Sequence, residues 1–172
     1  MWQARQEGND RGFTLVEMIV VIGIMALLLA IAAGGWQQLN RSNRVDGAIE
    51  EIRSVMSAGR IKAQTSGENQ YVGVHLTGEK FISTVWGGQF DPTTQTWTGS
   101  WRPVEGVDLL AGTSACAPST TAGVKNFRFT PRGSVSVISG GSTYTIMARS
   151  PGGDAKRCLV LNNVTGRARL VP

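Results

Sequence analysis

The feature that most constrains this chain is an apolar run near its N-terminus. Residues 18–36 form 19 consecutive positions without a charged side chain. As a helix rising 1.5 Å per residue, this run spans about 28 Å, which is close to the hydrocarbon thickness of a bilayer. One carboxylate, Glu17, stands at its start, five residues after Gly12. A charge at that depth is costly, so Glu17 requires a functional explanation.

Three kinds of segment compete to explain the run. A cleaved secretory signal needs an apolar region of about 7–15 residues and a cleavage site made of small residues. Residues 30–32 (Ala-Ile-Ala) supply small residues, but the run is longer than that and Glu17 interrupts its start. A plain membrane anchor accounts for the length and leaves Glu17 unexplained. The third kind is a helix that serves both as an anchor and in assembly.

The segment Arg-Gly-Phe-Thr-Leu-Val-Glu at residues 11–17 resembles the leader and helix start of type IV pilins and pseudopilins. The resemblance implies that residues 1–12 are a leader, which a prepilin peptidase removes after Gly12. Phe13 would become the methylated N-terminal residue, and Glu17 would guide assembly with other pilins. In a filament this carboxylate can pair with the terminal amine of a neighbouring subunit, which offsets its desolvation.

The same resemblance gives an expected location. The protein would cross the inner membrane once, with its C-terminal domain in the periplasm, and would assemble into a pilus or pseudopilus at the cell surface. Residues 13–36 would lie in the membrane or in the filament core.

An amphipathic segment follows the apolar run. Val45, Ile49, Ile52 and Met56 recur at i, i+4, i+7 and i+11, which is one stripe of an α-helix. The pattern predicts that one helix continues from Phe13 to about residue 65, where Ser-Gly at residues 66–67 ends it. Residues 37–65 are therefore expected to pack on a sheet.

Residues 66–172 have the composition of a globular β domain. Short alternating runs are separated by Gly, Asn and Pro. A helix followed by strands, without alternation of the two, predicts an α+β fold in which the long N-terminal helix packs on an antiparallel sheet. The strand candidates are residues 71–76, 80–86, 107–110, 124–130, 134–138, 143–148, 157–161 and 167–171.

Residues 89–114 match no pattern that predicts their structure. This region contains Trp97 and Trp101, and Trp86 precedes it. These tryptophans could stack on the bases of single-stranded DNA. A place in the core or in a subunit contact is the simpler interpretation.

The two cysteines, Cys116 and Cys158, are too few to define a disulfide framework. Behind an export-type segment, a disulfide between them is nevertheless the expected state. It would tie the region around Cys116 to the basic C-terminal strand.

No catalytic constellation is recognisable. His75 is the only histidine, the acidic residues lack metal-ligand spacing, and no glycine-rich segment ends in the Lys-Ser/Thr of a phosphate-binding loop. We therefore expect no enzyme, no cofactor and no metal site.

Positive charge is concentrated at the C-terminal end. Of the chain's net charge of +5, the side chains of residues 149–172 contribute +4. This field predicts an anionic partner, although a solvated basic face that aids solubility is the alternative. The cations are Arg149, Lys156, Arg157, Arg167 and Arg169.

The sharpest pattern at this end is Gly-Arg-Ala-Arg at residues 166–169. In a strand, Arg167 and Arg169 would share one face and stand about 7 Å apart, near the spacing of successive phosphates on a nucleic-acid strand. The planar guanidinium group suits phosphate oxygens. A charged edge strand that resists pairing with other chains is the alternative.

The C-terminal half extends the resemblance to the globular domain of FimT/GspH-type minor pilins and pseudopilins. It is carried by residues 127–134 (Phe-Arg-Phe-Thr-Pro-Arg-Gly-Ser), 143–146 (Thr-Tyr-Thr-Ile) and 166–170 (Gly-Arg-Ala-Arg-Leu). The FimT branch is associated with binding incoming DNA in natural transformation, and its Gly-Arg-x-Arg tail maps onto Gly166, Arg167 and Arg169.

The resemblance therefore implies contact with the phosphate backbone of DNA, independent of base sequence. Arg149, Lys156 and Arg157 would widen this surface. Two other roles stay open: a GspH-like minor pseudopilin of a type II secretion system, and a minor pilin that acts only in pilus assembly.

Overall fold

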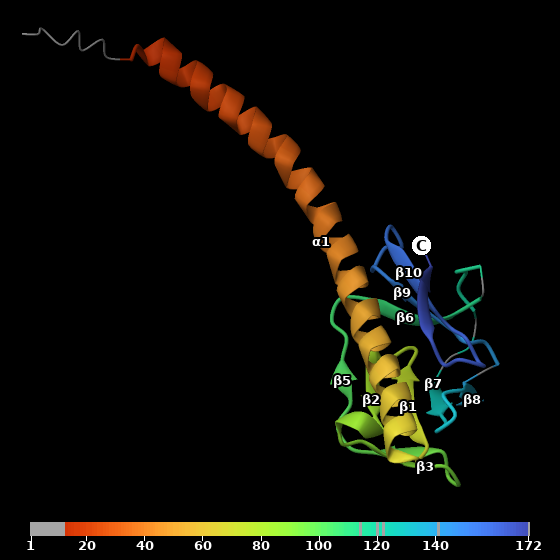
Figure 1. Ribbon diagram of the computed structural model, residues 1–172. Coiled ribbons are helices and arrows are strands. Elements are labelled where there is room, and N and C mark those ends of the chain that lie inside the picture. The colour runs from red at the N-terminus through yellow and green to blue at the C-terminus, as the bar shows by residue number, and fades with distance from the viewer. Residues whose placement is uncertain (1–12, 114, 120, 122, 141, 172) are drawn as a thin grey trace, which may run out of the picture. The chain divides into compact units, whose positions relative to one another are not determined.

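The computed structural model describes residues 13–113, 115–119, 121, 123–140 and 142–171. The chain divides into two compact units, Met1–Leu39 and Asn40–Pro172. One long helix, α1 (Leu15–Ser66), contributes residues to both units (Figure 1). The expected leader, including Gly12, lies outside the described residues.

The N-terminal unit consists of the first part of α1. The helix begins at Leu15, two residues after the expected start, because Thr14 caps it: the Thr14 hydroxyl accepts a hydrogen bond from the Glu17 amide at 3.2 Å. Glu17 is the acidic residue of the first turn, where a negative charge is favourable. By length and composition, the helix is long and apolar enough to cross a membrane.

In the C-terminal unit, the second part of α1 presents the expected apolar stripe to the core. Val45, Ile49, Ile52 and Met56 are each no more than 1% exposed, so the periodicity prediction is confirmed. The helix ends at Ser66, and Gly67 follows with a φ of +71°. The Gly67 amide donates to the Ala63 carbonyl at 3.2 Å, which is a typical helix C-cap.

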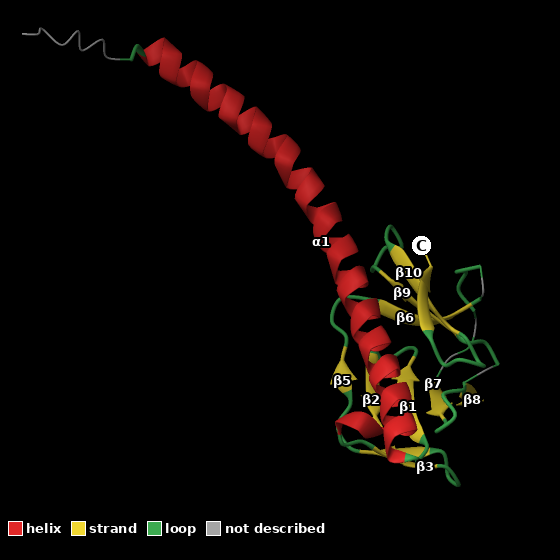
Figure 2. Cartoon of the chain, viewed as in Figure 1, coloured by secondary structure: helices red, strands yellow, loops and turns green. Residues whose placement is uncertain are grey.

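Besides the short helix described below, the described residues in the rest of this unit form antiparallel strands in three sheets. Figure 2 shows the strands in yellow. The α+β prediction of a long helix and antiparallel sheet is therefore confirmed. The five-stranded sheet, of order β5-β2-β1-β7-β8, comprises β1 (Gln70–His75), β2 (Lys80–Ser83), β5 (Arg102–Pro103), β7 (Val124–Phe129) and β8 (Val135–Ser139). The four-stranded sheet, of order β11-β10-β9-β6, comprises β6 (Asp108–Gly112), β9 (Thr145–Arg149), β10 (Lys156–Leu161) and β11 (Ala168–Val171). The third sheet pairs β3 (Gln89–Asp91) with β4 (Thr96–Thr98).

One continuous hydrophobic core joins α1 to the two larger sheets. Its buried residues run from Val45 to Leu161, so the core identified in the described residues lies entirely within Asn40–Pro172. Gly59 lets the helix approach the five-stranded sheet closely, since a Cβ there would lie 3.3 Å from the Phe129 ring. The C-terminal unit thus has the core that an independently folding domain requires.

The structure differs from the sequence prediction after residue 83. The strand expected over residues 80–86 ends at Ser83, and Thr84–Trp86 forms a 3-10 helix, η1. The Ser83 hydroxyl caps η1 by accepting the Val85 amide at 3.1 Å. The unassigned region 89–114 contains four strands, β3 to β6, of which only β6 overlaps a predicted strand.

The β3–β4 hairpin is closed by Asp91, whose carboxylate accepts the Thr93 amide at 2.8 Å. This hydrogen bond, followed by one from the Thr94 side chain, lowers the pKa of the Asp91 carboxyl. The hairpin places Trp97 against Gly73 of β1, where a Cβ would lie 2.6 Å from the indole nitrogen. That nitrogen donates to Asn126 at 2.7 Å.

Trp97 also takes part in a row of aromatic contacts. Its ring centroid lies 4.9 Å from that of Phe90 and 6.4 Å from that of Trp101. Both tryptophans are half-buried. These contacts support the interpretation that Trp97 and Trp101 pack on the sheet, rather than the alternative in which they stack on DNA bases.

Candidate functional site

The strand β11 forms one edge of the four-stranded sheet and carries Arg169. In the register with β10, Arg169 lies opposite Val160, and Ala168 lies opposite Leu161. Leu161 is buried and Ala168 packs against the core, so Arg169 points to the other, outer face of the sheet. Its side chain is exposed.

Arg167 precedes the strand and is also exposed. Its carbonyl accepts the Asn162 amide at 2.9 Å, which extends the β10–β11 pairing by one hydrogen bond. Arg167 and Arg169 are therefore both held at the same edge of the four-stranded sheet. Within the described part of the chain, neither takes part in a salt bridge.

Gly166 ends the tight turn that connects β10 to β11. The Asn162 side chain accepts the Val164 and Thr165 amides at 3.1 and 2.9 Å, and the Gly166 amide donates to the Asn162 carbonyl at 2.8 Å. Gly166 is buried with a φ of +62°, and a Cβ there would collide with the carbonyl oxygen of Gly133. The structure thus gives Gly166 a place in the packing between two turns, directly before Arg167.

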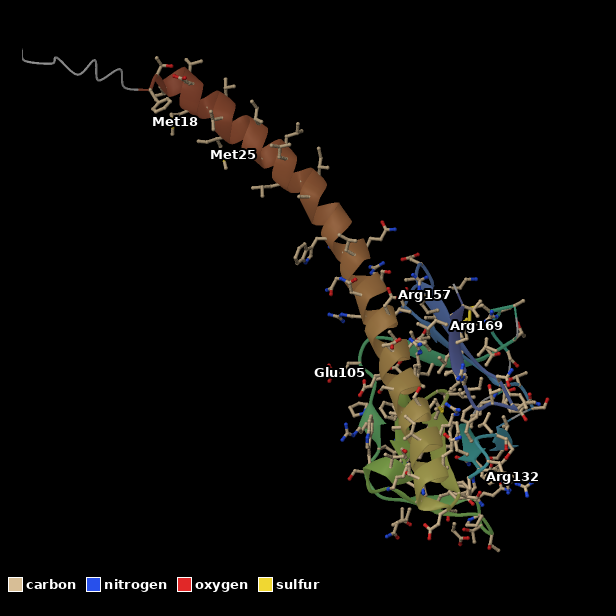
Figure 3. All side chains as sticks on the ribbon, in the orientation of Figure 1. Met18, Met25, Glu105, Arg132, Arg157 and Arg169 are labelled. Atoms are coloured by element: carbon tan, nitrogen blue, oxygen red, sulfur yellow. A yellow bond between two sulfur atoms is a disulfide. The ribbon has the colours of Figure 1, made fainter. Side chains whose placement is uncertain are left out.

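Two other candidate cations are paired with carboxylates. Arg149 of β9 contacts Asp108 of β6 at 3.1 Å. Arg157 of β10 contacts Asp46 of α1 at 2.9 Å, on the face of the sheet next to the helix (Figure 3). Arg157 therefore points away from the face that carries Arg169.

Lys156 is exposed and lies opposite Arg149, so both belong to the outer face. Val160 is the cross-strand partner of Arg169. Lys156 is four residues from Val160 along β10, so at 3.3 Å per residue these two positions are about 13 Å apart. Of the six DNA-binding candidates, Arg149, Lys156 and Arg169 lie on the outer face, and Arg167 directly precedes the strand that carries Arg169. Arg149 and Lys156 form one pair along the sheet, and Arg167 and Arg169 form a second.

The predicted disulfide between Cys116 and Cys158 is confirmed, with the two Cα atoms 5.7 Å apart. Cys158 lies opposite Met147 and Val171, on the outer face. Leu110, Met147 and Val171 pack around the disulfide and form a small apolar cluster. The disulfide therefore lies on the outer face between the two pairs of cations.

Metal-ligating groups and one pocket can be described outside this strand. In the residues that the structure describes, no group of three His, Cys, Asp or Glu side chains could hold a metal ion. An open pocket of about 200 Å³ lies between the β1–β2 turn and β6, which is below the usual size of a small-molecule site. Its Asp108 is engaged by Arg149.

Three further cations of the C-terminal unit were not among the predicted site residues. Lys125 is fully buried, donates to the Thr143 hydroxyl at 2.7 Å, and has its pKa lowered by burial to about 8. Arg60 of α1 and Arg132 of the β7–β8 turn lie beside the Gly133–Gly166 contact. The Pro-Arg-Gly turn was recognisable, but its neighbours depend on tertiary packing.

Residues 8–33 match the model described as the prokaryotic N-terminal methylation motif. This chain carries the N-terminal motif of prepilin-type proteins. The motif includes Gly12, Phe13 and Glu17, and it implies processing by prepilin peptidase and assembly with other pilins. Together with the apolar helix, it fits a single-pass, membrane-anchored pilin.

The prepilin motif supports a pilin or pseudopilin role, that is, a structural protein rather than an enzyme. It ends at residue 33, before the C-terminal unit begins. The chain matches no curated protein and no solved structure. The role of the C-terminal unit must therefore be inferred from its own residues.

Proposed function

We propose that this prepilin-type protein is a minor type IV pilin of the FimT/GspH kind that binds DNA and supports its uptake in natural transformation. The observation that carries the proposal is the pair Arg167 and Arg169. Both are exposed, lie at the edge of a sheet, and have no carboxylate partner in the described residues. By contrast, Arg149 and Arg157 are neutralised by nearby carboxylates.

The geometry suits a phosphate backbone. Residues two apart along a strand stand about 7 Å apart, close to the distance between successive phosphates, so each guanidinium group can address one phosphate. Contacts of this kind position the nucleic acid and carry no base information. DNA of any sequence is therefore the expected ligand, and Lys156 extends the positive field along the same face.

The proposal includes the topology that the N-terminus implies. A prepilin peptidase cleaves after Gly12, Phe13 becomes the methylated N-terminus, and Glu17 pairs with a neighbouring subunit. The C-terminal unit then faces the periplasm while the protein is in the inner membrane, and it faces the outside of an assembled pilus.

A second role is supported by one feature of the same strand. Charged side chains on an edge strand discourage pairing with other chains, whatever else they do. Arg167 and Arg169 would have this effect in a GspH-like minor pseudopilin of a type II secretion system, or in a minor pilin that acts only in assembly. DNA binding separates these roles from the first.

The test uses a soluble fragment of residues 40–172, which contains the buried core of the described chain. It should retard duplex DNA of arbitrary sequence in a gel, and binding should weaken steeply with salt because bound counterions are released. The double variant Arg167→Gln/Arg169→Gln should lose most of the binding. The salt slope, that is, the slope of the logarithm of the binding constant against the logarithm of the salt concentration, should become shallower by about 2. Each phosphate that is no longer neutralised removes about 0.9 from this slope.

The matched control is Arg53→Gln/Lys62→Gln, which removes the same net charge from α1. It should bind as the parent does. If the arginine pair can be replaced without loss, the assignment of the site is wrong. In cells, deletion of the gene should abolish DNA uptake, whereas a loss of protein secretion instead would favour the pseudopilin.

A further inference from the structure

Two turns, each belonging to a different sheet, contact each other next to Arg167. The β7–β8 turn (residues 130–134) and the β10–β11 turn (residues 162–166) are joined by a hydrogen bond from the Val135 amide to the Asn163 carbonyl at 2.9 Å. They also touch where Gly166 faces the carbonyl oxygen of Gly133. The ends of the two larger sheets are therefore fixed relative to each other at this point.

Each of these turns carries an exposed arginine. Arg132 directly precedes Gly133, and Arg167 directly follows Gly166. From standard bond lengths and the close contact between the two glycines, the Cα atoms of Arg132 and Arg167 are at most about 14 Å apart. Two extended arginine side chains can readily span neighbouring phosphate groups at this separation.

A third guanidinium group lies beneath the junction. A Cβ at Gly166 would stand 3.2 Å from the Arg60 Cδ, and one at Gly133 would stand 3.8 Å from the Arg60 Nε. That Nε is buried and has no hydrogen-bond partner in the described structure. None of Arg60, Arg132 and Arg167 belongs to a salt bridge among the described residues. Three uncompensated positive charges thus converge here, which raises the local potential for a polyanion.

We propose that Arg132 is a further phosphate-contacting residue, so that the binding surface is a ridge of Arg169, Arg167 and Arg132 that fits double-stranded DNA. This inference rests on the proposed DNA-binding function and specifies its ligand. Figure 3 labels the two ends of the ridge, Arg169 on β11 and Arg132 at the β7–β8 turn.

The length of the ridge favours a duplex. About 7 Å from Arg169 to Arg167 and at most about 14 Å from Arg167 to Arg132 limit the ridge to a span of at most about 21 Å. The grooves of B-DNA are about 6 Å and 12 Å wide, so a surface of this length can contact phosphates on both strands across a groove.

The side chains along the ridge also argue against single-stranded DNA. Single strands are bound mainly by stacking of their bases on exposed aromatic rings. The exposed large apolar residues near the ridge are aliphatic, namely Val164 and Leu170. In the described part of the C-terminal unit, the exposed aromatic residue is Trp86 of η1, and Arg102 lies over its ring at 4.2 Å.

The test uses the full chain in a non-ionic detergent and measures the anisotropy of a fluorescent 20-base-pair duplex at several salt concentrations. The variant Arg132→Gln should bind the duplex about threefold to tenfold more weakly, with a salt slope reduced by about 1. Arg132→Glu should weaken binding further. Lys62→Gln, which removes one charge from α1, should leave affinity and slope unchanged, and thermal unfolding should show that each variant is folded.

The outcomes separate this inference from the proposed function. If Arg167→Gln/Arg169→Gln abolishes binding but Arg132→Gln retains the parental affinity and slope, the ridge does not include Arg132 and only this inference fails. If the double variant binds normally, the proposed function itself fails. A labelled single strand of the same sequence should bind more weakly than the duplex; equal or tighter binding would overturn the assignment of double-stranded DNA.

Discussion

Replacing Gly166 with alanine probes the contact that holds the two turns together. Gly166 has a φ of +62°, a left-handed conformation that L-residues adopt at a cost of about 1–2 kcal/mol. The added methyl group would also strike the carbonyl oxygen of Gly133 and lie 3.2 Å from the Arg60 Cδ. Because a backbone oxygen cannot rotate away as a side chain can, the two turns must separate.

The expected loss of stability is the sum of the conformational cost at Gly166 and the cost of separating the turns. Separation of the turns stretches the Val135–Asn163 hydrogen bond, and breaking one such bond costs about 1 kcal/mol. Added to the conformational cost, Gly166→Ala should lower the free energy of unfolding by about 2–3 kcal/mol. A matched control is available in Gly67→Ala, where φ is +71° and nothing lies within 4 Å of the added Cβ. This control should show only the conformational part, about 1–2 kcal/mol.

Both variants can be measured in the fragment 40–172 by urea unfolding, followed by tryptophan fluorescence. In a thermal scan, each 1 kcal/mol should lower the midpoint by roughly 3–5 °C for a domain of this size. Gly166→Ala should also weaken DNA binding, because Arg167 and Arg132 lose their fixed separation, whereas Gly67→Ala should not. If Gly166→Ala costs no more than Gly67→Ala, the contact between the turns does not contribute to stability and the reasoning is wrong.

Two further predictions concern buried parts of the C-terminal unit. Serine at both Cys116 and Cys158 should lower the free energy of unfolding by about 4 kcal/mol, since the disulfide closes a loop with a sequence separation of 42. A reducing agent should destabilise the parent similarly and leave the double variant unaffected; an unaffected parent would contradict this. Burial lowers the pKa of Lys125 from 10.5 to about 8. Between pH 8 and pH 10.5 the unfolded chain therefore binds more protons than the folded chain, so the free energy of unfolding should rise with pH across that window. Lys125→Met should lack this rise in urea titrations from pH 7 to 10.5, and identical pH profiles would show that Lys125 is not desolvated.

The parts of the fold that sequence predicted are those governed by local periodicity. The stripe through Ile49 and Met56 needs only the helical repeat, and strands such as β7 and β10 need only alternation between turns. The disulfide followed from the export-type N-terminus and two cysteines. These features are determined by residues close together in the chain or by composition.

The parts that sequence did not predict depend on contacts between distant residues. The β3–β4 hairpin is held by Trp97, which fits over Gly73 and reaches Asn126, and no local pattern encodes that fit. At the candidate site, Arg149 and Arg157 looked equivalent to Arg169. Their carboxylate partners lie 41 residues away for Arg149 and on α1 for Arg157. Whether an arginine pairs with a carboxylate depends on the tertiary fold and cannot be determined from the sequence.

The Thr14 cap has a consequence for the chemistry of processing. Because the helix begins at Leu15, cleavage after Gly12 would leave only Phe13 and Thr14 ahead of the first turn. The new ammonium group would then stand close to the positive end of the helix dipole, an unfavourable arrangement that methylation of the amine does not remove. Glu17, in the same first turn, supplies the compensating charge. Maturation would thus leave the Thr14 cap in place and add a positive charge beside it, which a nearby carboxylate, from Glu17 or from a neighbouring subunit, would offset.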